Sequence, residues 1–350
     1  MNPSAQPTAR PADIAVPRQP ASVLAALTPT EVRDFFPEPA WSEVNALAAE
    51  HRFVSTAGIS ASDFHRTLAE ANPEVLIACW KTPPLPSDLP PRLRYVCYLA
   101  GSVKRLVTRA HLERGLIVTN WGSSISRIVA EWALFHILSS LRRASAWCIA
   151  MHKEGAWKNE KTETASLFGR TVGIHGFGLV ARELVKLLRP FGVEISAFAP
   201  DLTPAVEREW GVRPSASLEA LFADNDIVVE LAPLIPETRG IVQEKHLRLI
   251  RPGGVFVNIG RGAVVDEDAL VRVAREGKVQ FGLDVFTMEP LPADHPLRGL
   301  MNVSLTPHLA GPTTDRRRDA GEWALHNLHA YAAGRPLQAQ ITVHNYDLIT

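Results

Sequence analysis

The chain has 350 residues, of which 37 are basic and 37 acidic, so its formal net charge at pH 7 is zero. This balance provides no global field that would attract nucleic acid or anionic lipid, and we expect neither as a partner. The length predicts two domains, at roughly 100–200 residues each. Hydrophobic residues make up 46% of the chain and charged residues 21%, as in an ordinary globular protein.

The cysteines and the hydropathy of the chain indicate where in the cell the protein is expected. The three cysteines, Cys79, Cys97 and Cys148, are odd in number and far apart. They fit a reducing compartment better than a disulfide framework, so we expect a cytoplasmic location. No apolar run reaches about 18 residues, which argues against a membrane-spanning helix. Residues 1–22 are rich in proline and lack aromatic residues, which predicts a disordered tail, with a transit peptide as the alternative.

Short apolar runs alternate with helical patterns in the first part of the folded chain. A folded segment begins at Val23–Thr28, and buried strands are predicted at Val75–Trp80, Tyr95–Leu99 and Leu116–Thr119. This pattern indicates a small α/β unit. A long helix is expected from about Ser126 to Met151, and its apolar residues on nearly all sides predict burial between domains or subunits.

From Thr171 onward, strands and helices alternate regularly. Helices such as Val180–Leu188 and Asp266–Glu276 separate most of the strands, and a last helix is expected over about Thr314–Ala332. Repeated βα units predict a doubly wound parallel sheet with helices on both faces. The predicted strands are Val172–His175, Glu194–Phe198, Ile227–Leu231, Val255–Asn258, Phe281–Asp284 and Val303–Leu305.

A glycine-rich turn follows the first strand of this series and opens a helix. Its residues are Gly176, Phe177, Gly178, Leu179, Val180 and Ala181. The first glycine permits a tight turn, the second lets a pyrophosphate approach the backbone, and the small Ala181 lets helix and strand pack closely. The amino end of the helix would face the phosphates with N–H groups. The pattern predicts dinucleotide binding, with a simple strand–helix turn as the alternative.

The acidic residue expected after the next strand is displaced. A carboxylate about 20 residues beyond the glycine turn usually binds the ribose hydroxyls. Ala199 stands at this position, and Asp201 follows two residues later. Asp201 either substitutes for the missing acid or is a solvated loop residue. No basic residue follows immediately to bind a 2′-phosphate, which favours NAD, with NADP as the alternative.

Three further segments place chemically active side chains near strand ends. They are Asn258–Glu267, Gly282–Pro292 and Thr306–Gly311. Together with the glycine turn, and in this order and spacing, they resemble the signatures of the D-isomer-specific 2-hydroxyacid dehydrogenases. The resemblance implies a Rossmann cofactor domain over residues 123–321. It also implies a smaller, flavodoxin-like substrate domain from residues 23–122 and 322–350, with the cleft between the two domains.

The resemblance implies three catalytic residues. Arg261 would bind the substrate carboxylate and polarise the carbonyl, His308 would act as general acid and base, and Glu289 would bond the other imidazole nitrogen. The chemistry requires these residue types, because a guanidinium fork matches a planar 2-oxo acid and hydride reduction of a carbonyl needs a proton donor. A carboxylate partner fixes the tautomer of a histidine and favours its charged form. Taken singly, each residue could instead be an ordinary surface or loop side chain.

The resemblance also implies cofactor and substrate contacts. Those to the cofactor involve Ser126, Pro233, Thr238, Ile259, Gly260 and Asp284, the last near the nicotinamide amide. Backbone N–H groups of Ala100, Gly101 and Ser102 would bind the substrate carboxylate. Lys104 and Arg105 follow this loop and either bind a second acidic group or face solvent. Trp80 and Tyr98 either wall the substrate pocket or belong to the core.

The resemblance implies an oxidoreductase that transfers a hydride between a nicotinamide cofactor and a small D-2-hydroxy acid or 2-oxo acid, such as glyoxylate or hydroxypyruvate. The resemblance implies a homodimer through the Ser126–Met151 helix and the arm after it. The alternative is a dinucleotide-sensing binding protein or corepressor on the same fold. His326 and His329 have a spacing that could bind a metal, but no third ligand is evident and we expect no metal site.

Overall fold

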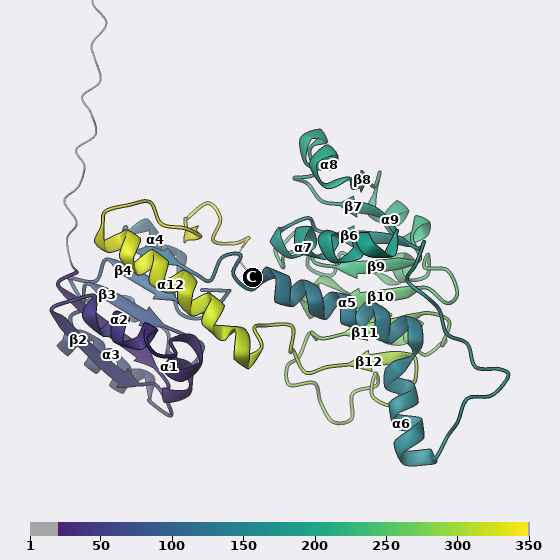
Figure 1. Ribbon diagram of the computed structural model, residues 1–350, viewed down its shortest axis with the longest axis horizontal. Coiled ribbons are helices and arrows are strands. Elements are labelled where there is room, and N and C mark those ends of the chain that lie inside the picture. Colours follow the sequence, from purple (N-terminus) through teal and green to yellow (C-terminus); the bar gives the residue numbers. More distant parts are fainter. Residues whose placement is uncertain (1–19, 349–350) are drawn as a thin grey trace, which may run out of the picture. The chain divides into compact units, whose positions relative to one another are not determined.

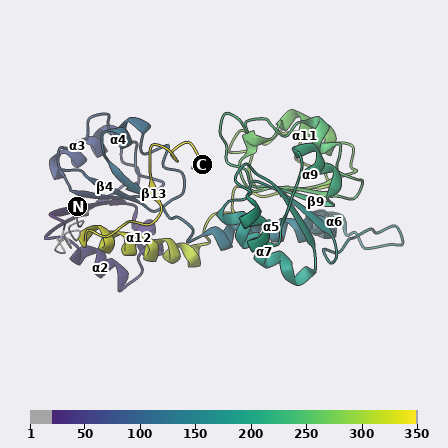
Figure 2. The same cartoon turned by 90° about the horizontal axis from the view of Figure 1, so that it is seen from above.

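The computed structural model describes residues 20–348, and the chain divides into two units. Unit 1 runs up to Trp121 and includes Gly321–Val343, whereas unit 2 comprises Gly122–Ala320 and the residues from His344 onward. Each unit contains one sheet with helices on both faces (Figure 1 and Figure 2). The predicted α/β class is therefore confirmed.

The sheet of unit 1 has the strand order β13-β5-β4-β3-β1-β2. All neighbouring strands are parallel except β13, which is antiparallel to β5. Strands β1 to β5 thus follow the flavodoxin-like order 2-1-3-4-5. The strands are β1 (Ser22–Leu27), β2 (Glu50–Ser55), β3 (Val75–Ala78), β4 (Tyr95–Tyr98), β5 (Ile117–Thr119) and β13 (Gln340–Ile341). The helices are α1 (Pro29–Phe35), α2 (Ala40–Ala46), α3 (Ala61–Ala71), α4 (Arg109–Glu113) and most of α12 (Arg317–Ala332).

The sheet of unit 2 has the order β12-β11-β10-β9-β6-β7-β8, and all its strands are parallel. This is the Rossmann order, in which ligands bind beyond the carboxyl ends of the strands, where the order reverses. Here the reversal lies between β6 and β9. The strands are β6 (Thr171–His175), β7 (Glu194–Phe198), β8 (Arg213–Pro214), β9 (Ile227–Glu230), β10 (Val255–Asn258), β11 (Gln280–Leu283) and β12 (Val303–Leu305).

Two hydrophobic clusters cover the two faces of the unit 2 sheet. Val172 and Ile174 pack with residues of α5 and α7 on one face, and Val228 and Phe256 pack with residues of α9, α10 and α11 on the other. The helices are α5 (Ser126–Arg142), α6 (Ala144–Glu154), α7 (Leu179–Leu188), α8 (Pro204–Trp210), α9 (Leu218–Asp224), α10 (Glu244–Leu247) and α11 (Glu267–Ala274). Because successive side chains of a strand alternate between faces, both faces of the central strands are apolar.

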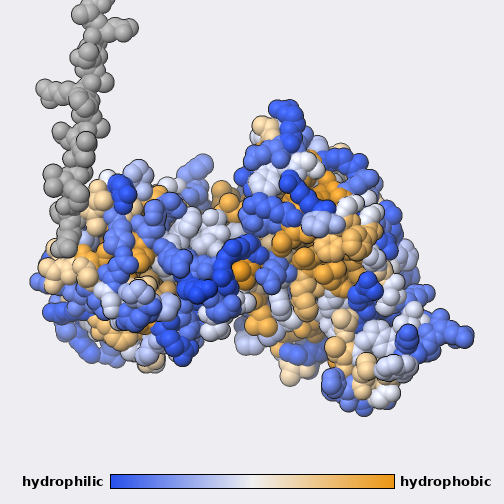
Figure 3. All heavy atoms as spheres, viewed as in Figure 1, coloured by the Kyte–Doolittle hydropathy of each residue, from blue (hydrophilic) through white to orange (hydrophobic). Residues whose placement is uncertain are grey.

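The prediction of one long helix over Ser126–Met151 is wrong. Helix α5 ends at Arg142 and α6 begins at Ala144, because Arg143 adopts a left-handed conformation with φ of 53°. Its N–H group bonds the carbonyl oxygen of Ser140 at 3.0 Å and closes the helix. No glycine marks this break, so the sequence lacks the usual signal for a helix end. Hydrophobic residues gather over α5 and α7 (Figure 3), and Phe135 on α5 is 43% exposed.

The tail predicted over residues 1–22 lies outside the described residues except for its last three, and Ser22 begins β1 instead. None of the described helices is long and apolar enough to cross a membrane. Within residues 20–348 no disulfide joins the three cysteines.

Helix α12 packs closely on α1, and this contact predicts a stability effect. A Cβ atom added at Gly321 in α12 would overlap the carbonyl oxygen of Phe35 at the end of α1. The substitution G321A should lower the free energy of unfolding by about 1–3 kcal/mol, because backbone atoms would have to move apart. Urea denaturation measures this effect. The control G311A adds a Cβ with no atom within 4 Å, and equal destabilisation by both substitutions would contradict the account.

Candidate active site

The glycine turn after β6 is held tightly against the loop after β9. Gly176 has φ of 86°, and a Cβ atom there would lie 2.7 Å from the backbone of Ala232. Its N–H group bonds the carbonyl oxygen of Phe198, at the end of β7, at 2.9 Å. Both the left-handed conformation and the close approach therefore require glycine at this position.

The first N–H groups of α7 have no hydrogen-bond acceptor among the described residues. Gly178 is the N-cap residue and has no side chain to cap the helix, and the first turn contains no acidic residue. A Cβ atom at Gly178 would meet nothing within 4 Å, so the backbone is open on this side. Leu179 is exposed whereas Phe177 is buried, which leaves only the backbone of Phe177 for contact. An open helix amino terminus on a glycine turn fits the pyrophosphate of a dinucleotide.

Four further predicted cofactor contacts, Pro233, Thr238, Ser126 and Asp201, lie in three places of unit 2. Thr238 closes the loop after β9, because its hydroxyl donates to the carbonyl of Pro233 and accepts from the N–H group of Ile235 at 2.9 Å. Ser126 is buried at the first turn of α5. Asp201 is exposed in the loop after β7, and its carboxylate makes no hydrogen bond or ion pair with any described residue.

Arg261 projects from the loop after β10, which Asn258 holds in place. The Asn258 side chain accepts from the N–H group of Gly260 and donates to the carbonyl of Arg261, both at 3.1 Å. The Arg261 guanidinium donates to the carbonyl of Gly260 at 2.7 Å. Burial lowers the pKa of Arg261, and the negative charge of Glu289 acts in the opposite direction. A partly desolvated guanidinium of this kind is well suited to bind a carboxylate.

Glu289 and His308 form a hydrogen-bonded pair. The Nδ1 atom of His308 lies 2.7 Å from one carboxylate oxygen of Glu289, and the other oxygen accepts from the N–H group of Phe286 at 3.0 Å. Because a carboxylate accepts hydrogen bonds, Nδ1 carries the proton in this pair. This arrangement leaves Nε2 to exchange a proton with a substrate. The structure thus brings together the predicted Arg261, Glu289 and His308.

Asp284 holds the loop that carries His308. Its carboxylate is fully buried after β11, and its main-chain carbonyl accepts from the N–H group of His308 at 2.9 Å. Four protein donors bond its carboxylate, which makes Asp284 the anchor of this loop. Its predicted contact to the nicotinamide stays a prediction. The donors are Thr306 Oγ1 at 2.6 Å, Leu309 N at 2.9 Å, Trp132 Nε1 at 3.1 Å and Ala310 N at 2.8 Å.

A buried histidine on α5 extends this network and was missed in the sequence. The Nε2 atom of His136 lies 2.9 Å from the hydroxyl of Thr306. Since Thr306 donates its own proton to Asp284, His136 must be the donor, so its Nε2 atom carries a proton. The signal in the sequence was a single histidine within the apolar stretch of residues 132–138 in α5, and its partner lies 170 positions away.

The predicted substrate loop lies in unit 1 after β4. The side chain of Asn120 donates to the carbonyl of Gly101 at 2.8 Å, and a Cβ atom at Gly101 would lie 2.9 Å from the Trp121 ring. In the described part of the chain no acceptor faces the N–H groups of Gly101 and Ser102. Of the two aromatic candidates, Tyr98 belongs to the core and Trp80 is 40% exposed. Ala100 is buried, and Lys104 and Arg105 are exposed.

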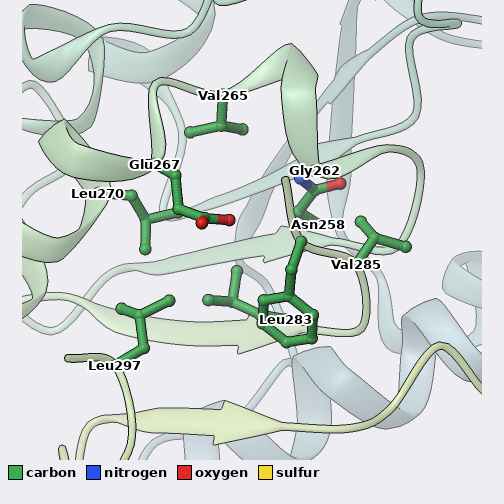
Figure 4. A pocket seen from close by; sticks show the side chains of 9 residues that line it. Asn258, Gly262, Val265, Glu267, Leu270, Leu283, Val285 and Leu297 are labelled. Carbon is green, nitrogen blue, oxygen red and sulfur yellow. The ribbon is translucent and has the colours of Figure 1, made fainter. Parts of the chain in front are cut away.

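A cavity of about 10 Å³ lies beneath the Arg261 loop and is too small for a substrate. Asn258, Gly262 and Glu267 are among the residues that line it, and the Glu267 carboxylate points toward its middle (Figure 4). Glu267 also accepts from the N–H group of Thr287 at 2.8 Å, which braces the segment that carries Glu289.

The chain is similar to known proteins in its sequence and in its fold. Residues 134–310 match the model of the D-isomer specific 2-hydroxyacid dehydrogenase, NAD binding domain. The glyoxylate reductase of Aeropyrum pernix is 33% identical over 252 residues, which cover 70% of this chain and 75% of that protein. The chain belongs to the D-isomer-specific 2-hydroxyacid dehydrogenase family. The predicted enzyme class and the nicotinamide cofactor are thereby confirmed, and this protein is an NAD(P)-dependent dehydrogenase.

Solved structures support the fold of the dehydrogenase. A glyoxylate reductase from Paecilomyes thermophila is 25% identical, with a TM-score of 0.78, and the match covers 92% of this chain and 98% of that one. The apo D-mandelate dehydrogenase of Rhodotorula graminis is 22% identical, with a TM-score of 0.79, and the match covers 92% and 97% of the two chains. At this identity the second likeness shows the fold alone.

The buried His136 predicts a loss of stability in mild acid. Burial lowers the pKa of His136 from 6.5 to about 4, and the charge of Asp284 opposes this shift. The unfolded chain therefore takes up a proton at this residue before the native state does. The free energy of unfolding should fall by up to about 3 kcal/mol as the pH drops through this window.

Urea denaturation above and below this window measures the effect. The substitution H136Q keeps a donor for Thr306 but cannot titrate, so it should remove this part of the pH dependence. The matched control H326Q replaces an exposed histidine of α12. The same pH dependence in H136Q and in the unchanged protein would contradict a neutral, buried His136.

Proposed function

We propose that this dehydrogenase reduces a small 2-oxo acid to the D-2-hydroxy acid with NAD(P)H, and that glyoxylate or hydroxypyruvate is its substrate. The observation that carries the proposal is the pair between His308 and Glu289, with Nδ1 and Oε2 2.7 Å apart, and the half-buried Arg261, on which the charge of Glu289 acts. The likeness to glyoxylate reductases, such as that of Aeropyrum pernix, supports the choice of substrate.

Arg261 binds the anionic end of the substrate in this proposal. Its guanidinium matches the planar carboxylate of a 2-oxo acid and polarises the adjacent carbonyl. Partial burial strengthens this interaction, because the same charge acts more strongly where water is excluded. In unit 1, the N–H groups of Gly101 and Ser102 are proposed to bind the substrate carboxylate.

His308 supplies the proton. When a hydride reaches the carbonyl carbon, negative charge develops on the oxygen, and the Nε2 proton of His308 neutralises it. Glu289 stabilises the imidazolium form that must exist before this transfer, and its bond to Nδ1 fixes the orientation of the ring. In the direction of oxidation, His308 removes the hydroxyl proton instead.

The cofactor supplies the hydride when bound. The open amino end of α7 is proposed to hold its pyrophosphate, with the loop after β9 and the backbone of Ile259 and Gly260 as further contacts. Asp201 is proposed to bind the ribose hydroxyls, because Ala199 stands where an acidic residue usually does so. We therefore propose NAD as the cofactor, with NADP as the alternative.

We also propose a homodimer formed through α5, α6 and the arm that follows them. Several large apolar side chains of this region are exposed in the single chain, which supports burial in a partner. They are Phe135, Ile149, Met151 and Trp157. The cytoplasmic location remains a prediction from the number and spacing of the cysteines.

An assay of nicotinamide absorbance with several 2-oxo acids tests the function. The substitution H308A should lower kcat by about 10²–10⁴-fold, the range typical of a lost general acid. R261A should lower kcat and also raise KM, because the guanidinium binds the substrate in both the ground and the transition state. The control H326A, at an exposed histidine, should keep the rate of the unchanged enzyme.

Two outcomes of this assay would contradict the proposal. A normal rate in H308A or R261A would remove these residues from catalysis. Tight binding of NADH without turnover of any 2-oxo acid would favour a dinucleotide-sensing protein instead.

A further inference from the structure

Two ionisable residues face each other at the ends of the central strands of unit 2. His175 is the last residue of β6 and Glu230 the last residue of β9, and the two are paired in the strand register. Both side chains are buried, and Nδ1 of His175 lies 2.6 Å from Oε2 of Glu230. The strands lie side by side in the middle of the sheet (Figure 1). The pair thus lies where the strand order reverses.

The contacts of the pair reach into both loops that face the cofactor site. The second carboxylate oxygen of Glu230 accepts from the N–H group of Ala232 at 2.8 Å. The main-chain carbonyl of His175 accepts from the N–H group of Leu231 at 2.9 Å. Gly176 follows His175 directly and packs against Ala232 without room for a Cβ atom. One side-chain pair therefore ties the glycine turn to the start of the loop after β9.

Stability alone gives little reason for this arrangement. Burial by itself would lower the pKa of His175, but the charge and the hydrogen bond of Glu230 outweigh it and raise the pKa. Replacing such a pair by apolar residues of similar volume is often neutral or stabilising. Its position between two cofactor loops suggests a different role.

We propose that His175 and Glu230 are a positioning pair for the dinucleotide, which holds the glycine turn and the loop after β9 at the spacing that binding requires. The pair acts through the backbone of Ala232 and Gly176. This inference depends on the proposed use of these two loops by the cofactor. It assigns no chemical step to either side chain.

The test compares NADH affinity with stability in matched variants. Fluorescence titration gives the Kd of NADH, and thermal denaturation gives Tm. The double variant H175L/E230L replaces the pair by apolar side chains and removes the acceptor for the Ala232 N–H group. E230Q keeps an acceptor for Ala232 and a donor for His175 without the charge.

A control variant removes a tie at the opposite end of the same strands. The hydroxyl of Thr171, at the start of β6, accepts from the N–H group of Asp226, just before β9, at 2.9 Å. T171V removes this hydrogen bond far from the cofactor loops. It should lower Tm and leave the Kd of NADH unchanged.

The proposal predicts a Kd about tenfold higher in H175L/E230L, equal to about 1.4 kcal/mol. The Tm should fall no further than in T171V, because the apolar pair offsets part of the cost of the unpaired Ala232 N–H group. E230Q should bind NADH within about twofold of the unchanged protein, because both hydrogen bonds persist. If the double variant does not fold, E230M serves instead. It leaves the buried His175 without its partner and should lower Tm, but E230M, unlike T171V, should also raise the Kd of NADH.

Unchanged NADH affinity in H175L/E230L, or in E230M if the double variant does not fold, would overturn the proposal. The proposal would also be overturned if the rise in Kd only reflected unfolding, with the Kd of NADH rising in proportion to the loss of Tm. If the unchanged protein binds neither NADH nor NADPH, the proposed function itself fails, and this result is distinct from an effect of the pair.

Discussion

The buried carboxylate of Asp284 is the constraint on which the candidate active site depends. A carboxylate without access to water is stable only when its oxygens accept a full set of hydrogen bonds. In this structure the donors come from α5 and from the loop after β12. The loop must therefore return to the end of β11, and this return places His308 in a left-handed backbone conformation with φ of 53°.

The other parts of the site follow the same principle, in which buried polar groups fix loops at strand ends. Asn258 folds the Arg261 loop onto the end of β10, and Glu267 braces the segment that carries Glu289. Arg261, Glu289 and His308 thus come from the loops after β10, β11 and β12, which are neighbours in the sheet. Three residues far apart in the sequence become one site because parallel strands end at the same edge.

Elements and loops could be predicted from the sequence where a local pattern of residues determines the structure. Apolar runs located most strands within one or two residues, and the glycine turn and motif spacing located the cofactor loop and the residues proposed for catalysis. Strand β2 was missed, because its sequence Glu50–Ser55 carries charged residues and pairs only with β1 at the edge of the sheet. The break at Arg143 was missed because a residue other than glycine takes the left-handed conformation.

The buried hydrogen bonds of His136 and Glu230 could not be predicted from the sequence, for a different reason. His136 and Glu230 stand in otherwise apolar segments, where they look like exceptions to the pattern. Their partners, Thr306 and His175, lie 170 and 55 positions away, so no local rule connects them. Only the packed sheet shows that each exception satisfies another buried group.

Steady-state kinetics of D284N test the central claim most directly. An asparagine at this position would present an NH₂ group to a site that contains only donors, so the loop carrying His308 should move. The account predicts a kcat about 10²-fold lower, since a displacement of about 1 Å in a reacting group can cost that much. A D284N enzyme with the kcat of the unchanged protein would contradict the claim that this carboxylate sets the geometry of the site.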